Sequence, residues 1–152
     1  MDLQTYLDNA VKVSRQQTLA KSDQLTLGEL ILRLEPLLQD EKADNPRKVV
    51  YDFGQLYPTR IDSWRGIYAE LALDFENRDS GQSHGPMFMI DFHKMLIDTV
   101  GKTFEGYKGG GFVMSRQTPI WVANHGDSDN TALINVVHDD YQIILITGYR
   151  AV

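Results

Sequence analysis

Glycine, lysine and aromatic residues are concentrated between Gly101 and Gly111, in the order Gly-Lys-Thr-Phe-Glu-Gly-Tyr-Lys-Gly-Gly-Gly. Glycine amides can approach a ligand closely because no Cβ intervenes, and successive amides can form a concave anion site. We therefore predict that Tyr107, Lys108, Gly109 and Gly110 contact a phosphorylated, nucleotide-like ligand. Lys108 would neutralise a phosphate, and Tyr107 would lie against a base or ribose. A glycine-rich hairpin that only reverses the chain explains the same composition equally well.

This stretch does not have the spacing of a nucleotide-binding P-loop. Only Gly101-Lys102-Thr103 matches the end of that motif, and Leu96 stands where its first glycine belongs. The stretch also follows a predicted helix, whereas a P-loop precedes one. The sequence therefore excludes a P-loop.

A second candidate lies between Tyr57 and Gly66, where a tryptophan and two arginines stand close together. A guanidinium group makes bidentate bonds to phosphate or carboxylate, and an indole offers a stacking face. We predict Arg60, Trp64 and Arg65 as ligand-binding residues. The alternative is that Trp64 anchors this segment in the core, as tryptophans usually do, while Arg65 pairs with a nearby carboxylate.

A third candidate is Asn124, at the end of a predicted strand that contains Trp121. Side chains at a strand end can face a pocket, so Asn124 is predicted to complete the binding site. Its alternative role is to form a turn with the histidine, glycine and aspartate that follow it. Trp121 alternates with Ala123 and is predicted to pack inward.

Catalytic and metal-binding motifs are missing from the sequence. The four histidines have no metal-ligand spacing, no nucleophile elbow is present, and the chain has no cysteine. His93, on an apolar helix face, is predicted to be a core residue. We therefore predict no catalytic residue, no metal and no cofactor, while distant residues that converge in space keep an enzyme as a third alternative.

Length and composition are those of one globular domain. The chain has 152 residues, 42% of them hydrophobic and 24% charged. Its formal net charge of −6 argues against nonspecific binding to nucleic acid. No run is long and apolar enough to span a membrane, and no secretory signal opens the chain. We expect a cytoplasmic protein without membrane contact.

The hydrophobic pattern predicts an α+β fold. Thr26 and Glu29 have the spacing of a capping box, and Pro36 should kink or end the helix that follows. Residues 40–48 and 54–66 are predicted as irregular connections. Helices are predicted at 2–14, 27–38 and 86–100, and strands at 49–53, 70–76, 112–114, 120–123, 132–137 and 141–147.

The predicted architecture is a single domain, 1–152, with residues 1–24 as a candidate for a partly separate N-terminal helical arm. N-terminal helices and one later helix pack on a mostly antiparallel sheet that ends in a C-terminal β-meander. In the strand at 70–76, Ala72 is placed on the solvated face. The inner face of the helix at 86–100 is predicted to consist of Met89, Ile90, His93, Leu96, Ile97 and Val100.

Several stretches from about residue 25 onward carry a resemblance to a known group. They are Thr26 to Ile31, Tyr51 to Gly54, Pro58-Thr59, Ser63 to Gly66 with Tyr68, Glu70 to Leu73, Thr103 to Gly110, and Thr118 to Asn124. In these stretches the chain resembles a family of small hypothetical proteins encoded by tailed bacteriophages. The resemblance implies a viral accessory protein in the bacterial cytoplasm, and it transfers no catalytic residues. Such proteins commonly counter host defence.

Three functions are compatible with these observations. The first is a noncatalytic binder that sequesters a phosphorylated nucleotide-like ligand, with a pocket that two subunits of an oligomer could share. The second is a protein-directed inhibitor of a host defence complex, of the restriction or CRISPR type, whose acidic surface meets a basic groove. The third is a nucleotide-modifying enzyme.

Overall fold

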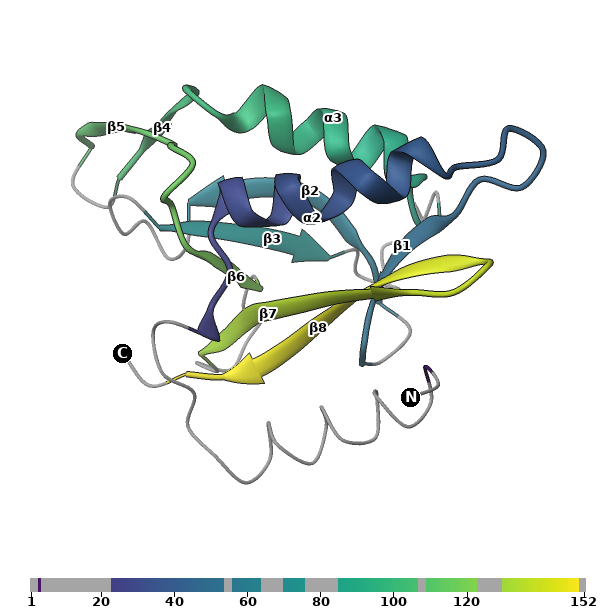
Figure 1. Ribbon diagram of the computed structural model, residues 1–152. Helices are drawn as coiled ribbons and strands as arrows, with labels where there is room; N and C mark the ends of the chain where they lie inside the picture. The colour runs from purple at the N-terminus through teal and green to yellow at the C-terminus, as the bar shows by residue number, and fades with distance from the viewer. Residues whose placement is uncertain are drawn as a thin grey trace.

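The computed structural model describes residues 3, 23–53, 56–63, 70–75, 85–106, 109–122 and 130–150. In these residues two helices and a six-stranded sheet, with a separate two-stranded hairpin, form the α+β architecture that the sequence predicts (Figure 1). Apart from Leu3, the predicted helix at 2–14 lies outside the described residues. No helix in the described ranges has the length and apolarity needed to cross a membrane.

Helix α2, Leu27–Gln39, begins at the predicted capping box. The Glu29 N–H donates to the Thr26 hydroxyl and the Thr26 N–H donates to the Glu29 carboxylate, each at 3.2 Å. The Gly28 N–H donates to the Arg116 carbonyl at 2.8 Å, and a Cβ built on Gly28 would lie 2.8 Å from the Arg116 Cβ, so glycine permits this close approach. Pro36 was predicted to kink or end this helix, and it does not end it, because the helix continues to Gln39.

Helix α3, Met89–Thr99, packs beside α2 with a different inner face from the predicted one. Its buried residues are Met89, Phe92, Leu96 and Thr99. Ile90 and Ile97 were predicted inside but are 63% and 38% exposed. The helix is apolar around much of its circumference, so two stripes compete, and the stripe that buries the large Phe92 ring is the one adopted. The helix also begins three residues after Pro86, which was predicted in its first turn.

The large sheet has the strand order β1-β8-β7-β6-β3-β2. Pairs β1/β8 and β3/β6 are parallel, and the other three pairs are antiparallel, including the predicted β6-β7-β8 meander. Strands β4 and β5 form the separate hairpin. The strands are β1 Lys48–Tyr51, β2 Pro58–Ser63, β3 Leu71–Phe75, β4 Thr103–Glu105, β5 Gly111–Val113, β6 Ile120–Val122, β7 Thr131–His138 and β8 Gln142–Tyr149.

Strand β2 corrects the prediction of an irregular segment at 54–66. The strand is at the edge of the sheet and pairs antiparallel with β3. Among its residues only Pro58 and Ile61 are apolar, so the alternation that marks a half-buried strand is weak. Pro58 is its first residue, a position where a missing N–H is tolerated.

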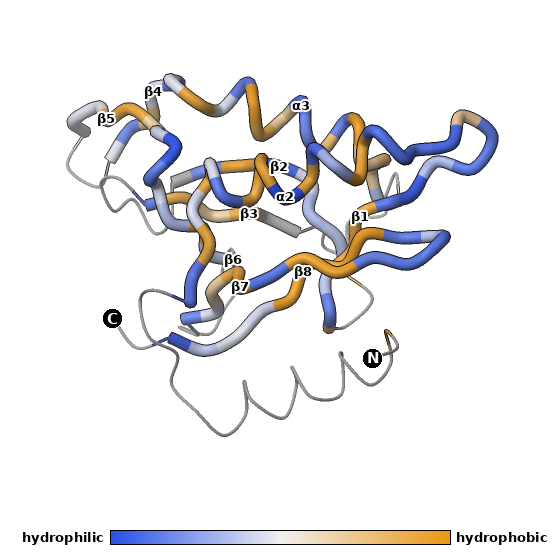
Figure 2. Tube along the Cα trace, in the orientation of Figure 1, coloured by the Kyte–Doolittle hydropathy of each residue, from blue (hydrophilic) through white to orange (hydrophobic). Residues whose placement is uncertain are grey.

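Both helices cover one face of the sheet, and the main core lies between the helices and that face (Figures 1 and 2). Leu71 and Leu73 of β3 point into this core. Ala72, predicted to face solvent, is instead 3% exposed and packs in a smaller cluster with Trp121 and Ala132. Trp121 is buried, as predicted, and its Nε1–H donates to the Glu70 carboxylate at 2.6 Å.

Asp52 connects the end of β1 to β8. Its carboxylate accepts from the Thr147 N–H at 3.0 Å and from the Thr147 hydroxyl at 2.8 Å. Burial raises the pKa of Asp52 above its ordinary value of 3.8, against the opposing effect of these two hydrogen bonds. The carboxylate is therefore a structural tie whose ionisation opposes folding.

Candidate functional site

A hollow of about 480 Å³ lies between β2, α3 and β4. Each wall comes from a different part of the chain. Strand β2 contributes Arg60 and Ile61, and the residues at the start of the β4–β5 hairpin contribute Lys102 and Phe104. The third wall is one side of α3. Because five of the residues that line the hollow are charged, we call it the charged hollow and take it as the candidate functional site.

A glycine turn places Lys102 at this hollow. Helix α3 ends at Thr99, and Gly101 adopts a φ of +84°, which sends the chain into β4. The turn is fixed to the hairpin, because the Gly101 N–H donates to the Met114 carbonyl at 2.7 Å and the Met114 N–H donates to the Lys102 carbonyl at 2.9 Å. Lys102 Nζ lies 5.3 Å from the centre of the Phe104 ring. Two backbone hydrogen bonds to Met114 and a cation–π contact with Phe104 thus hold Lys102 at the hollow.

The side of α3 that faces the hollow carries Asp91, Lys94 and Asp98. Their spacing of three and four residues puts them on one stripe of the helix. Met95 and Thr99, next to this stripe, form part of the lining, and the Thr99 hydroxyl donates to the Met95 carbonyl at 2.8 Å. The hollow therefore combines a charged helix wall with an apolar part made by Met95, Ile61 and Phe104.

The charges of the hollow are three cations and two carboxylates. Within the part of the chain that the structure describes, neither Lys94 nor Lys102 forms an ion pair with a carboxylate, and the carboxylates of Asp91 and Asp98 likewise pair with no cation. Arg60 completes the set from β2. The two lysines and the two aspartates of α3 are solvent-facing charges that a ligand with complementary groups can contact.

The predicted binding residues are only partly among the described ones. Arg60 lines the charged hollow. Gly109 and Gly110 form the turn between β4 and β5, where the Gly109 N–H donates to the Gly106 carbonyl at 3.0 Å and the Gly106 N–H donates to the Gly110 carbonyl at 2.7 Å. The Gly109 amide is thus used within the hairpin, and its φ of +82° meets the needs of chain reversal.

The other predicted binding residues lie outside the described residues. They are Trp64, Arg65, Tyr107, Lys108 and Asn124. Two of the segments singled out in the sequence meet at the hollow, since Arg60 comes from the 57–66 segment and Lys102 from the glycine-rich stretch. Sequence reasoning missed Asp91, Lys94 and Asp98. Their three-and-four spacing is present in the sequence, but only the orientation of α3 with Phe92 inward shows that this stripe faces the hollow.

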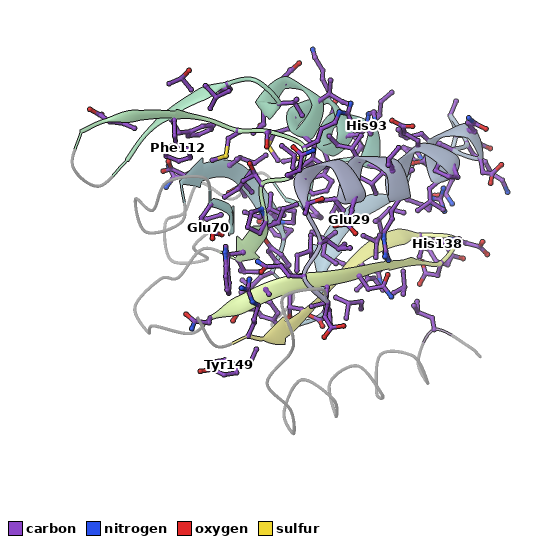
Figure 3. All side chains as sticks on the ribbon, turned by 60° about the vertical axis from the view of Figure 1, so that its left-hand side comes forward. Glu29, Glu70, His93, Phe112, His138 and Tyr149 are labelled. Carbon is purple, nitrogen blue, oxygen red and sulfur yellow. The ribbon has the colours of Figure 1, made fainter. Side chains whose placement is uncertain are left out.

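A second hollow, of about 420 Å³, lies between the 40–47 connection and the turn that joins β7 to β8. Figure 3 shows His138 at this end of the molecule. Arg47 Nε donates to Glu41 Oε1 at 3.0 Å, Nη2 donates to the Leu37 carbonyl at 2.8 Å, and Nη1 lies 3.1 Å from His138 Nδ1. Because a guanidinium only donates, Nδ1 is the acceptor and the neutral ring carries its proton on Nε2. We call this arrangement the Arg47 clasp.

Histidine and carboxylate positions give little support to a metal site. Among the described residues, no group of three or more histidine, aspartate or glutamate side chains is arranged to hold an ion. His93, predicted as a core residue, is half-buried between the helices, with Nε2 3.9 Å from Glu35 Oε1 (Figure 3). It belongs to the α2–α3 contact and lies outside both hollows.

Comparison with known proteins adds no family to these observations. No protein-family model, curated protein or solved structure matches the chain. The function is therefore argued from the geometry and charge of the charged hollow.

Proposed function

We propose that this protein is a noncatalytic binding protein that captures a phosphorylated, nucleotide-like small molecule in the charged hollow. The observation that carries the proposal is the convergence of Arg60, Lys94 and Lys102, from three separate elements, on one cavity. Charge-assisted hydrogen bonds from lysine and arginine to phosphate are about twice as strong as neutral ones. Tight capture needs no general acid or base.

The cavity has a size and lining suited to such a ligand. Its volume of about 480 Å³ falls within the range of small-molecule pockets. The apolar part at Met95, Ile61 and Phe104 can contact a base or sugar while the cations contact phosphate. The sequence predictions of Arg65, Tyr107, Lys108 and Asn124 as further contacts remain part of this proposal.

The biological setting that we propose is counter-defence by a bacteriophage. It is supported by the sequence resemblance to phage-encoded proteins and by a binding site that needs no chemistry to sequester a signal. Capture of a host nucleotide signal in the bacterial cytoplasm would stop the response that the signal triggers. A homo-oligomer would allow neighbouring subunits to share the ligand.

A thermal-shift screen against a panel of nucleotides and sugar phosphates tests the proposal. We expect stabilisation by at least one phosphorylated compound, and loss of that stabilisation in Lys102→Ala and Arg60→Ala. Lys42→Ala is the matched control, because Lys42 is an exposed lysine that lines the second hollow. Native mass spectrometry gives an independent readout. Flat curves for the whole panel, with no ligand retained in native spectra, would contradict the proposal.

A protein-directed inhibitor is the second candidate, and a specific observation favours it. Leu32 of α2 and Ile90 of α3 are 61% and 63% exposed. Large apolar side chains on exposed helix faces can contact a partner protein. A stoichiometric, salt-sensitive partner recovered from host lysate, and lost in Leu32→Glu or Ile90→Glu, would favour this function. Conversion of a nucleotide in the screen to a new product would instead establish an enzyme.

A further inference from the structure

The charged hollow contains two carboxylates that a phosphate group by itself does not use. Asp91 and Asp98 lie on the α3 wall. Carboxylates and phosphates repel each other, so a site for phosphate alone would be expected to exclude them. Their presence indicates a ligand that has hydrogen-bond donors as well as negative charge.

The two kinds of charge are largely separated between the walls. Arg60 and Lys102 come from the β2 and β4 side, whereas α3 contributes both carboxylates, with Lys94 between them on the same helix. Seven residues separate Asp91 from Asp98, a rise of about 10.5 Å along the helix. Lys102 follows Asp98 closely in the chain, so Asp91 is the carboxylate farther along the helix from this cation. A ligand lying along the hollow would place phosphate toward Lys102 and its donor edge toward Asp91.

The chemistry of a carboxylate limits which base fits at Asp91. An ionised carboxylate only accepts hydrogen bonds, and its two oxygens suit two adjacent donors. The Watson–Crick edge of guanine offers adjacent N1–H and N2–H₂ donors. Adenine has an acceptor, N1, beside its amino group, and the N3–H of uracil lies between two carbonyl acceptors. Guanine is therefore the common base that best complements this side chain.

We infer that the charged hollow selects guanine nucleotides, with Asp91 accepting from the N1–H and N2–H₂ groups while Lys102 and Arg60 bind phosphate. The inference rests on the proposed function, since it assigns the base specificity of the same site. Met95 and Phe104 supply apolar contact to the base and sugar.

Isothermal titration with GMP, IMP, AMP and ribose 5-phosphate tests the inference. We expect GMP to bind about tenfold or more tightly than AMP, which corresponds to about 1.4 kcal/mol. IMP, which keeps N1–H but lacks the N2 amino group, should lie between them. In Asp91→Asn the preference for GMP should fall to near unity, while ribose 5-phosphate binding stays the same or improves as a negative charge is removed. Asp98→Asn is the matched control, because it removes the same charge and should keep the preference.

The outcomes separate this inference from the proposed function. Equal binding of all four compounds overturns the guanine assignment and leaves a phosphate-binding site in place. Loss of preference in Asp98→Asn rather than in Asp91→Asn also overturns the assignment. If none of the four compounds binds, and the wider panel gives no stabilisation, the proposed function fails together with the inference.

Discussion

The two hollows of this protein are similar in volume, but Arg47 of the second hollow and the two lysines of the charged hollow differ in how their charges are satisfied. In the second hollow, Arg47 is bound to a carboxylate, a backbone carbonyl and a histidine nitrogen of the same chain. In the charged hollow, Lys94 and Lys102 form no ion pair within the described residues. A charge that the fold itself satisfies stabilises the fold, whereas a charge left open to solvent is available to a ligand. The volume of a cavity alone would not distinguish the two.

The Arg47 clasp provides the largest expected effect that would test this distinction. Arg47→Ala should lower the free energy of unfolding by about 3 kcal/mol, because it leaves a buried carboxylate and a carbonyl without their donor. The Arg47 side chain is only 9% exposed. Arg47 binds Glu41 through Oε1, and Glu41 Oε2 is buried with no hydrogen-bond partner among the described atoms. Urea denaturation followed by circular dichroism measures the change.

Two further variants keep this test informative if Arg47→Ala does not fold. His138→Ala removes only one acceptor, at an exposed position, and should lower stability by about 1 kcal/mol. Lys42→Ala, in the same connection but outside the clasp, should change stability little. Wild-type stability in both arginine and histidine variants would show that the clasp contributes nothing, and the comparison between the hollows would lose its basis.

Glu70 gives a second, smaller test of a charge satisfied within the fold. Its carboxylate accepts from the Nε1–H of Trp121, which is buried on the sheet face opposite the helices. Glu70→Gln keeps an acceptor but loses the charge, so we expect a loss of about 1 kcal/mol in the free energy of unfolding. Glu105→Gln, on the exposed β4 strand, is the control and should be neutral. An equal effect of the two changes would contradict a structural role for the Glu70 charge.

Asp52 is an intermediate case, because neutral donors rather than a cation satisfy its carboxylate. Burial raises its pKa above 3.8, so the folded state holds the proton more tightly than the unfolded state. Its contribution to stability is therefore full below the unfolded pKa and is lost as pH rises through the folded pKa. Asp52→Asn cannot ionise. Relative to wild type, it should gain stability in urea denaturation as pH rises from below 3.8 through the raised pKa of Asp52. A difference that stays constant or falls with rising pH would contradict this assignment.

The sequence predicted those elements that form because of residues close to one another in the chain. The capping box at Thr26 and Glu29 and the strand predicted at 70–76 depend on neighbouring residues. Both are present, the strand as Leu71–Phe75, although Ala72 is buried where the pattern put it on the solvated face. The orientation of α3 depends on which apolar stripe the sheet and α2 can bury. Ile90 and Ile97 were therefore assigned to the wrong side, and Phe92 was overlooked. Strand β2 was missed for a related reason, since its partner β3, rather than its own pattern, makes it a strand.

The candidate site also combines residues that the sequence pointed to with residues that only the tertiary structure places there. Composition drew attention to the segment that holds Arg60 and to the glycine-rich stretch that begins at Gly101, and both contribute to the hollow. The Gly109 N–H is used in the turn of the hairpin, and a ligand contact at Gly109 and Gly110 stays a prediction. Asp91, Lys94 and Asp98 could not be assigned to a site without the position of α3. A charged stripe on a helix is ordinarily a solvated face.

Removal of the two lysines of the charged hollow should cost little stability, which tests the difference between the hollows most directly. Lys94→Ala combined with Lys102→Ala should change the free energy of unfolding by no more than about 0.5 kcal/mol, because only an exposed cation–π contact with Phe104 is lost. The same double variant should lose phosphorylated ligands in the thermal-shift screen. A stability loss close to that of Arg47→Ala would mean that these lysines serve the fold. Loss of binding with stability unchanged is the combination that only a ligand site explains.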